Sequence, residues 1–574
     1  MDRLSSRTDP LMRVESYQYD ANGNLSQVTD RKGQVTSYGY DAFDRLTQVT
    51  YADGSTTSYS YDAGNRLTQV VDSISGTITY GYDNLDRVMS KTTPQGTVSY
   101  TYDAASRRTS MTVAGQPTIN YTYDNANRLT QITQGTSIVT LAYDDAGRRT
   151  TLALPNGVIT EYAYDAASQL TGLTYKKGTA VLGNLTYEYD AGGRRTRVGG
   201  SLARTGLPQI VSATSYDAAN RQTAFGSQSL TYDVDGNLTS DGINSYGWNA
   251  RNQLVSITGP GLDATFQYDG FGKRISKTIH GTTTSYLYDR GDVVQVQVGG
   301  SVSANMLLGL GVDEVLTRSD SSGTWALLTD ALGSTVALTD SSGSIQTQHT
   351  YEPFGRTTTN GTLSDNPSQY TGRDNDGTGM YYYRARYYSP TLQRFISEDP
   401  IRFGGGVNFY SYVENDPINA IDPSGLTPYV CCRPLLGKRG KLTLGIPKHC
   451  YILVVTQGDG SPDPHGTSNL DGTRKTYGLH DPEGCQRPVP NDPSDRVKDS
   501  SKECVRIPKW SMASEEYIAP CSNQPSSCRG CDDKYRKLGP NSNTFVSDVL
   551  KCAGIRPPNL DVIAPGYNRG GYRP

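Results

Sequence analysis

Two aspartates, each followed by proline, are the first residues of this sequence that could do chemistry. Asp399-Pro400 and Asp422-Pro423 stand shortly before the composition of the chain changes. Two carboxylates held close together cannot both ionise easily, so one keeps a proton while the other can activate water. Asp-Pro pairs also initiate turns. The residues alone therefore leave open whether these aspartates are catalytic or only form turns.

A second candidate site lies near the C-terminus, in two predicted elements. Residues 448–455, KHCYILVV, predict a buried strand with His449 at its start, and residues 539–550, GPNSNTFVSDVL, predict a turn into an amphipathic helix. A helix N-terminus stabilises a developing anion, and a histidine can accept the proton of a hydroxyl such as that of Ser542. The same serine could equally be only the helix cap. Other residues are alternatives: His480 as the base, and Cys450 or Cys531 as the nucleophile.

Cysteines are confined to the same end of the chain, because all nine lie after residue 430. Cys528 and Cys531 form a Cys-x-x-Cys pair that could hold zinc together with Cys504 and Cys521. Those spacings are irregular, so no cofactor is predicted and zinc stays an alternative. Disulfides in an oxidising compartment and unpaired thiols are the other two interpretations.

A repeat of about 20 residues precedes both sites and must position the first. It is marked by Tyr-Asp followed by a short turn, and 41 tyrosines stand against 9 phenylalanines. A fixed period of this length is typical of a repeat architecture. The positions are Tyr19, Tyr40, Tyr61, Tyr82, Tyr102, Tyr123, Tyr143, Tyr164 and Tyr189, then weaker copies at Tyr216, Tyr232, Trp248, Tyr268 and Tyr288.

Each repeat is predicted to be a β-hairpin. In residues 45–67, polar residues alternate with β-branched or aromatic ones, and two turn signals interrupt them at 52–55 and 62–65. Asp caps backbone amides in such turns and Gly supplies the positive φ. Single hairpins are marginal in water, so the repeats must stack on one another. The predicted fold is mainly β: an antiparallel ribbon without long helices, followed by a small α+β domain.

The motif Tyr-Asp-x-x-Gly-Arg-Leu at this spacing resembles the YD repeat of bacterial RHS proteins, insecticidal toxin-complex C subunits and animal teneurins. The resemblance covers roughly residues 15 to 426. Residues 330–334, DALGS, and 351–356, YEPFGR, are similar to the start of the RHS-associated core. Residues 381–426, which begin YYYRARYYSP and end in DPSGL, resemble the signature of that core.

The resemblance implies a layout and a reaction. Repeats of this family spiral into a hollow shell, here short enough to be partial, and an aspartyl autoprotease cuts the chain just before a variable toxin. Carried over, Asp399 and Asp422 are the catalytic pair, and Leu426-Thr427 is the scissile bond. Arg402 and Phe403 stand where many relatives have Gly-Leu or a similar pair. An arginine near Asp399 could depress the pKa of that aspartate and weaken its acid–base role.

Composition supports a separate C-terminal domain. Residues 427–574 carry 21 Lys plus Arg against 15 Asp plus Glu, about +6, and the remainder carries 33 against 42, about −9. The predicted domains are a YD-repeat shell over 1–300, an RHS-associated core over 301–426, and a cysteine-rich toxin domain over 427–574. Some 148 residues are enough for an independent core.

The order of elements in the tail resembles permuted papain-like hydrolases, with His449 transferred as base and Ser542 at the nucleophile position. This implies a toxin that is a hydrolase or acyltransferase. One alternative is a nuclease or ADP-ribosyltransferase acting on nucleic acid or translation components, which the basic charge of the tail would suit. Another is a non-enzymatic adhesive or receptor-binding tip.

Partners and location follow from the same family reading. The expected partners are a cognate immunity protein, a secretion apparatus or delivery spike such as type VI, and an unidentified component of the target cell. The first residues, MDRLSS, are polar and no run of 18 apolar residues occurs, so we predict neither a signal peptide nor a membrane span. Secretion would then need a dedicated machine. The short array predicts either a C-terminal portion of a larger gene product or a displaced tip.

Overall fold

Antiparallel β-sheet dominates the computed structural model of the chain, which describes residues 3–203, 206–208, 210–362, 364–426 and 429–430. Between residues 20 and 300, the described part contains no helix. The prediction of a mainly β ribbon is therefore confirmed. No helix of the described residues is long and apolar enough to cross a membrane.

The first sheet has 19 strands, and neighbours in the chain pair antiparallel. Its strands are β1 (Ser6–Thr8), β2 (Val14–Tyr19), β3 (Leu25–Thr29), β4 (Val35–Tyr40), β5 (Leu46–Thr50), β6 (Thr56–Tyr61), β7 (Leu67–Asp72), β8 (Gly76–Tyr82), β9 (Val88–Thr93), β10 (Gly96–Tyr102), β11 (Arg108–Val113), β12 (Ile119–Tyr123), β13 (Leu129–Gln134), β14 (Ser137–Tyr143), β15 (Arg149–Ala153), β16 (Val158–Tyr164), β17 (Leu170–Lys177), β18 (Ala180–Tyr189) and β19 (Arg195–Gly199).

A second sheet of 14 strands follows, again ordered as in the chain. Its strands are β23 (Thr231–Tyr232), β24 (Leu238–Ser240), β25 (Ser245–Trp248), β26 (Leu254–Gly259), β27 (Leu262–Tyr268), β28 (Arg274–Ile279), β29 (Thr282–Asp289), β30 (Asp292–Val298), β31 (Ser301–Leu308), β32 (Val315–Asp320), β33 (Gly323–Thr329), β34 (Thr335–Thr339), β35 (Ile345–Tyr351) and β36 (Thr357–Gly361). The predicted domain boundary at residue 300 falls between β30 and β31, which pair antiparallel within this sheet.

Short elements complete the described chain. A three-stranded sheet joins the two large ones, and the core carries two small sheets and three 3-10 helices. They are β20 (Thr214–Tyr216), β21 (Gln222–Phe225), β22 (Gln228–Ser229), η1 (Tyr370–Gly372), β37 (Asp374–Asn375), β38 (Tyr381–Tyr383), β39 (Arg386–Ser389), β40 (Arg394–Phe395), η2 (Arg402–Gly405), η3 (Val413–Asn415), β41 (Ala420–Ile421) and β42 (Tyr429–Val430).

The local chemistry of one repeat explains its motif. Asp62 Oδ1 accepts the N–H groups of Gly64 and Arg66, both at 2.9 Å, and its Oδ2 accepts Arg66 Nε at 2.6 Å. The Arg66 guanidinium then lies 5.0 Å from the centre of the next repeat's Tyr82 ring, and the Tyr82 hydroxyl donates to the Leu67 carbonyl at 2.7 Å. Each repeat is thereby tied to its successor by a turn cap and a cation–π contact.

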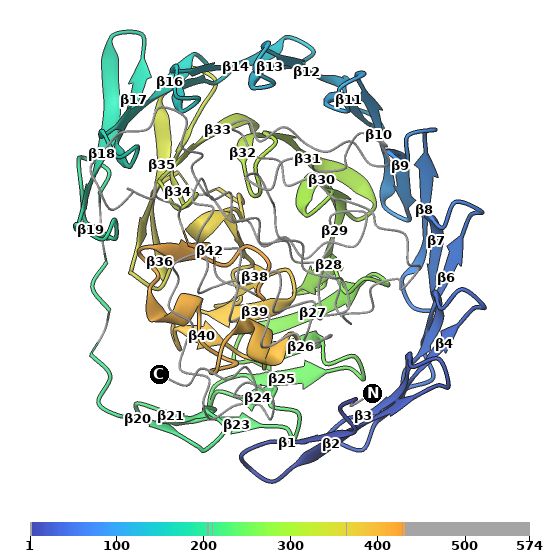
Figure 1. The fold of residues 1–574 in the computed structure, drawn as a ribbon. Coiled ribbons are helices and arrows are strands. Elements are labelled where there is room, and N and C mark those ends of the chain that lie inside the picture. The colour runs from blue at the N-terminus through green and yellow to red at the C-terminus, as the bar shows by residue number, and fades with distance from the viewer. Residues whose placement is uncertain (1–2, 204–205, 209, 363, 427–428, 431–574) are drawn as a thin grey trace, which may run out of the picture.

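The 20-residue period is also a period of curvature. At each predicted Tyr-Asp tyrosine, and at Trp248, the strand register shifts by a β-bulge directly before the aromatic residue. A bulge bends its strand and increases the local twist. In Figure 1 the first sheet follows a wide arc from β2 to β19, and the second sheet follows a tighter arc within it.

The two sheets share a buried core, and the last described residues lie inside the arcs (Figure 1). Between the sheets, Asp289 accepts the Tyr100 hydroxyl and Arg108, at 2.7 and 2.6 Å. Residues 366–426 are packed around a cluster of fully buried aromatic side chains that includes Tyr383, Tyr388 and Phe395. This rigid aromatic packing supports the segments that carry the two Asp-Pro motifs.

Candidate active site

The structure brings the two Asp-Pro aspartates together in the core. Asp399 lies between β40 and η2, three residues before η2 begins, and Asp422 directly follows β41. Their exposed fractions are only 3% and 2%, so both carboxyl groups are removed from bulk water. Proximity of two buried carboxyls is the condition under which they share a proton.

Arg386 at the start of β39 links the pair, and sequence reasoning did not single it out. One of its terminal nitrogens lies 2.8 Å from Asp399 Oδ2 and 3.7 Å from Asp422 Oδ2. The guanidinium lies 3.6 Å from the centre of the Phe395 ring, and it donates to the Phe409 carbonyl at 2.8 Å and to the Gly425 carbonyl. A buried acid pair requires a compensating cation, so the arginines of YYYRARYYSP were the available signal.

Electrostatics separate the two carboxyls. Burial, opposed by Arg386 and reinforced by Asp422, raises the pKa of Asp399 to about 7. Burial also raises the pKa of Asp422, whereas Arg386 and hydrogen bonds from its own loop oppose that rise. Burial lowers the pKa of Arg386. The pair can therefore hold one proton near neutral pH, when a water-exposed aspartate would be fully ionised.

The loop that ends at Leu426 is folded onto Asp422. Asp422 Oδ1 accepts the N–H groups of Gly425 and Leu426 at 2.9 and 3.1 Å and the Ser424 hydroxyl at 3.1 Å. Three donors on one oxygen favour the ionised form of Asp422 and leave its Oδ2 free of this loop. Leu426 itself is 2% exposed.

The carbonyl of Leu426 borders Asp399. A Cβ atom added to Gly405, at the end of η2, would overlap Asp399 Oδ2 and come within 2.7 Å of the Leu426 carbonyl oxygen. Both oxygens thus border one space about the size of a methyl group, and only glycine leaves that space open. In this arrangement a protonated Asp399 can donate to the carbonyl, and Asp422 can act as a base.

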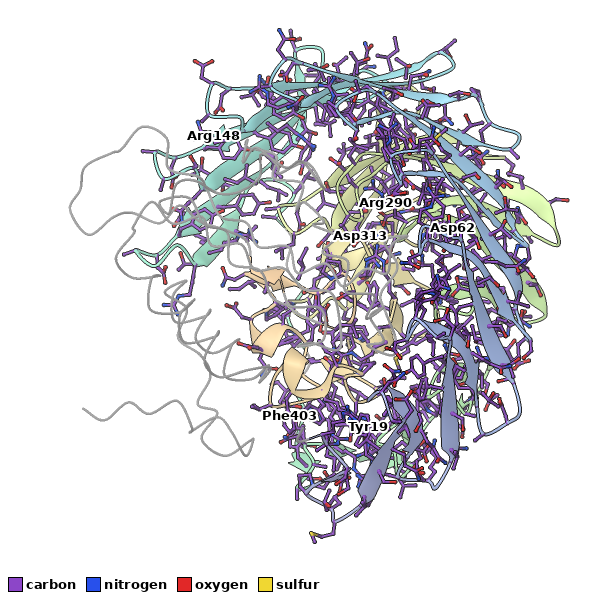
Figure 2. All side chains as sticks on the ribbon, turned by 45° about the vertical axis from the view of Figure 1, so that its right-hand side comes forward. Tyr19, Asp62, Arg148, Arg290, Asp313 and Phe403 are labelled. Atoms are coloured by element: carbon purple, nitrogen blue, oxygen red, sulfur yellow. The ribbon has the colours of Figure 1, made fainter. Side chains whose placement is uncertain are left out.

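The concern about Arg402 is not supported by its contacts. Its guanidinium binds Glu15 and Tyr17 of β2 and lies 5.4 Å from the Tyr17 ring centre, and the pKa of Asp399 is raised rather than depressed. Arg402 has a left-handed backbone conformation, with φ +56°, and its side chain contacts the first sheet. In Figure 2 the labelled Phe403, the residue after Arg402, lies on the ribbon of the core, and Tyr19 lies on the first strands of the first sheet.

The other predicted site residues lie outside the part of the chain that the structure describes. These are Thr427, His449, Cys450, His480, Cys504, Cys521, Cys528, Cys531 and Ser542. Among the described residues, no group of three or more His, Cys, Asp or Glu side chains could hold a metal ion.

Comparison with known families identifies the repeats. The family model described as RHS Repeat matches overlapping segments within residues 2–118. The family model described as Teneurin YD-shell matches residues 158–418, which contain β16 to β40, Asp399 and Arg386.

Individual relatives are matched over part of their length. The tRNA nuclease WapA of Bacillus subtilis (strain 168) is 33% identical over 276 residues, which are 44% of this chain and 11% of WapA. Toxin subunit YenC1 of Yersinia entomophaga is 27% identical over 284 residues, which are 42% of this chain and 29% of YenC1. The matched part of the chain thus covers between about a tenth and less than a third of these curated relatives.

A solved structure shows the same fold. The Photorhabdus luminescens Tc holotoxin pore, with its TccC3 component, superposes with a TM-score of 0.51 over 73% of this chain and 30% of that one, at 18% identity. At that identity the likeness concerns the shell architecture alone.

Proposed function

We propose that this chain, which belongs to the family of RHS-repeat and YD-shell proteins, cuts itself after Leu426 and frees the segment that begins at Thr427. The single observation that carries the proposal is the buried triad of Asp399, Arg386 and Asp422, in which Asp399 Oδ2 and the Leu426 carbonyl oxygen border one space. A buried acid pair with a proton to share is one arrangement that hydrolyses peptide bonds without a metal.

In the proposed hydrolysis, Asp399 is the acid and Asp422 is the base. Ionised Asp422 takes a proton from water as the water oxygen bonds to the Leu426 carbonyl carbon, and protonated Asp399 transfers its proton to the carbonyl oxygen. Asp422 then gives its proton to the Thr427 nitrogen as the C–N bond breaks. Asp399 recovers a proton from the diol, so both groups return to their starting states.

Replacement of either carboxyl tests the proposal. Asp399→Asn and Asp422→Asn should leave the full chain whole, while the parent yields two pieces and a new N-terminus at Thr427. Asp340→Asn is a matched control, because Asp340 caps an exposed turn of the second sheet and accepts Ser342 N–H at 2.9 Å. An intact parent with a folded shell would contradict the proposal.

For the freed segment, we propose a toxin. Its reaction is proposed to be that of a hydrolase or acyltransferase, with His449 as base and Ser542 as nucleophile. The nuclease alternative is supported by the names of two relatives, the tRNA nuclease WapA and a probable deoxyribonuclease of Dickeya dadantii. A cognate immunity protein, a delivery apparatus and export from the producing cell complete the proposal.

Expression of the full chain in a bacterial cytosol, or directed to the periplasm, separates these alternatives. Growth arrest that is lost in Ser542→Ala and His449→Ala supports the hydrolase. Arrest that survives both changes but comes with cleaved nucleic acid supports the nuclease. Asp399→Asn should reduce arrest in either case, because the segment would stay attached to its shell.

A further inference from the structure

The segment that carries Asp399 is gripped on both sides by the N-terminal repeats. We call the four gripping residues the N-terminal brace: Arg7 in β1, Glu15 and Tyr17 in β2, and Arg31 in the turn between β3 and β4. Their partners in the core are the residue before Asp399 and the residue three positions after it. The brace joins parts of the chain up to 387 residues apart.

On the first side, Arg31 binds Glu398 through two parallel contacts. Its terminal nitrogens lie 2.9 and 2.7 Å from the two carboxylate oxygens, and the side-chain exposures are 5% and 11%. Arg7 adds a contact of 3.6 Å to the same carboxylate. A bidentate pair fixes direction as well as distance, and loss of one partner would leave a buried charge unpaired.

On the second side, Arg402 reaches back to the shell. Its guanidinium binds Glu15 and the Tyr17 hydroxyl, and its backbone N–H donates to the Asp399 carbonyl at 2.9 Å. Glu15 is 4% exposed and also accepts Arg7 at 2.9 Å. The residues on both sides of Asp399 are therefore held by contacts from β1, β2 and the turn between β3 and β4.

The brace lies where the first strands of the second sheet contact the first strands of the first sheet. Arg31 N–H donates to Asp235 Oδ1 at 3.1 Å, and Lys32 Nζ lies 2.8 Å from Asp233 Oδ2. Both aspartates belong to the turn between β23 and β24. Arg31 consequently contacts the first sheet, the second sheet and the core at once, and it can do so only when the spiral has closed.

We propose that the N-terminal brace positions Asp399 for cleavage, so that the chain cuts only after its first strands have docked onto the core. This rests on the self-cleavage proposed above. Its consequence is an assembly checkpoint: an unclosed shell leaves Asp399 displaced, and the segment after Leu426 stays attached. Misplacement of a reacting group by about 1 Å is enough to slow a reaction about a hundredfold.

The test compares full-length variants refolded side by side. Arg31→Gln and Arg402→Gln should each cut about a hundredfold more slowly than the parent. Arg31→Lys and Arg402→Lys keep the charge and should stay within about tenfold of it. Arg197→Gln is the matched control, because Arg197 and its partner Glu188 are both more than 60% exposed, and it should cut at the parental rate.

Folding is checked separately by hydrogen exchange of β29 to β35 in each variant. If Arg31→Gln fails this check, Arg402→Gln carries the test, because its side chain is 35% exposed and tolerates change better. Parental cutting rates in well-folded Gln variants overturn the brace alone. A parent that never cuts overturns the self-cleavage on which the brace depends, so the two failures are distinguishable.

Discussion

The rate of self-cleavage should fall as pH rises through about 7. Only the pH is changed, and the group that titrates is Asp399. Burial and the neighbouring Asp422 raise the pKa of Asp399 to about 7, whereas Arg386 opposes this rise. Only its protonated form can donate to the Leu426 carbonyl. Above the pKa each further pH unit removes nine-tenths of that form, which is about 1.4 kcal/mol of apparent barrier.

The rate is therefore expected to fall about fiftyfold between pH 7 and about pH 9, because the protonated fraction falls from about one half to about one hundredth. Unfolded chain recovered from inclusion bodies is diluted from urea into buffers between about pH 5 and pH 9, and uncut chain is followed by intact mass. The uncut Asp399→Asn variant, refolded in parallel, shows by protease resistance that the shell forms at each pH. A rate that is flat or that increases through pH 7 would refute the role of Asp399 as acid.

Three further predictions concern single residues. Gly405→Ala should stop cleavage in an otherwise folded shell, because its Cβ would overlap a catalytic oxygen, while Gly404→Ala, which meets only the Ile401 side chain at 3.5 Å, should cut normally; gel analysis of both distinguishes them. Arg386→Met should stop cleavage, because it removes the cation between two buried carboxyls, and Arg386→Lys should retain a slow rate in the same assay. Arg66→Ala should speed amide hydrogen exchange in its own repeat and the next, since it loses a turn contact and a cation–π contact; the more exposed Arg194→Ala should leave exchange near the parental rate.

The repeats could be predicted because each motif residue acts on its near neighbours. Asp62 caps its own turn and binds Arg66, four residues on, and Tyr82 reaches back 15 residues to the Leu67 carbonyl. Trp248 stands at the tyrosine position of its repeat, and the bulge is kept there. Because these contacts join residues that are near each other in sequence, the same residue types recur in each repeat, and the period is visible in the sequence.

Only part of the site could be predicted from the sequence, because several of its residues contact partners that are far away in the chain. The spacing of the two Asp-Pro motifs resembles a family signature and predicts that Asp399 and Asp422 form a pair; both carboxyls lie beside Arg386 in the structure, and their catalytic role stays a prediction. Arg31 gave no such signal, and the arginines of YYYRARYYSP did not show which of them meets the aspartates, since the partners of Arg386 and Arg31 lie 13 and 367 residues away and meet them only through the fold. Nearness in sequence suggested that the charge of Arg402 acts on Asp399, whereas its guanidinium binds Glu15 of β2, a contact that the sequence could not show.

Cleavage would also change the charge balance of the site in one direction. The cut creates a carboxylate at Leu426, where its carbonyl oxygen now borders Asp399. Three acids would then face the single buried cation of Arg386, in surroundings where like charges repel more strongly than in water. The repulsion opposes return of the new Thr427 amine to this carboxylate and favours withdrawal of the product end. The burial that keeps a proton on the acid pair before the cut thus makes the cut hard to reverse.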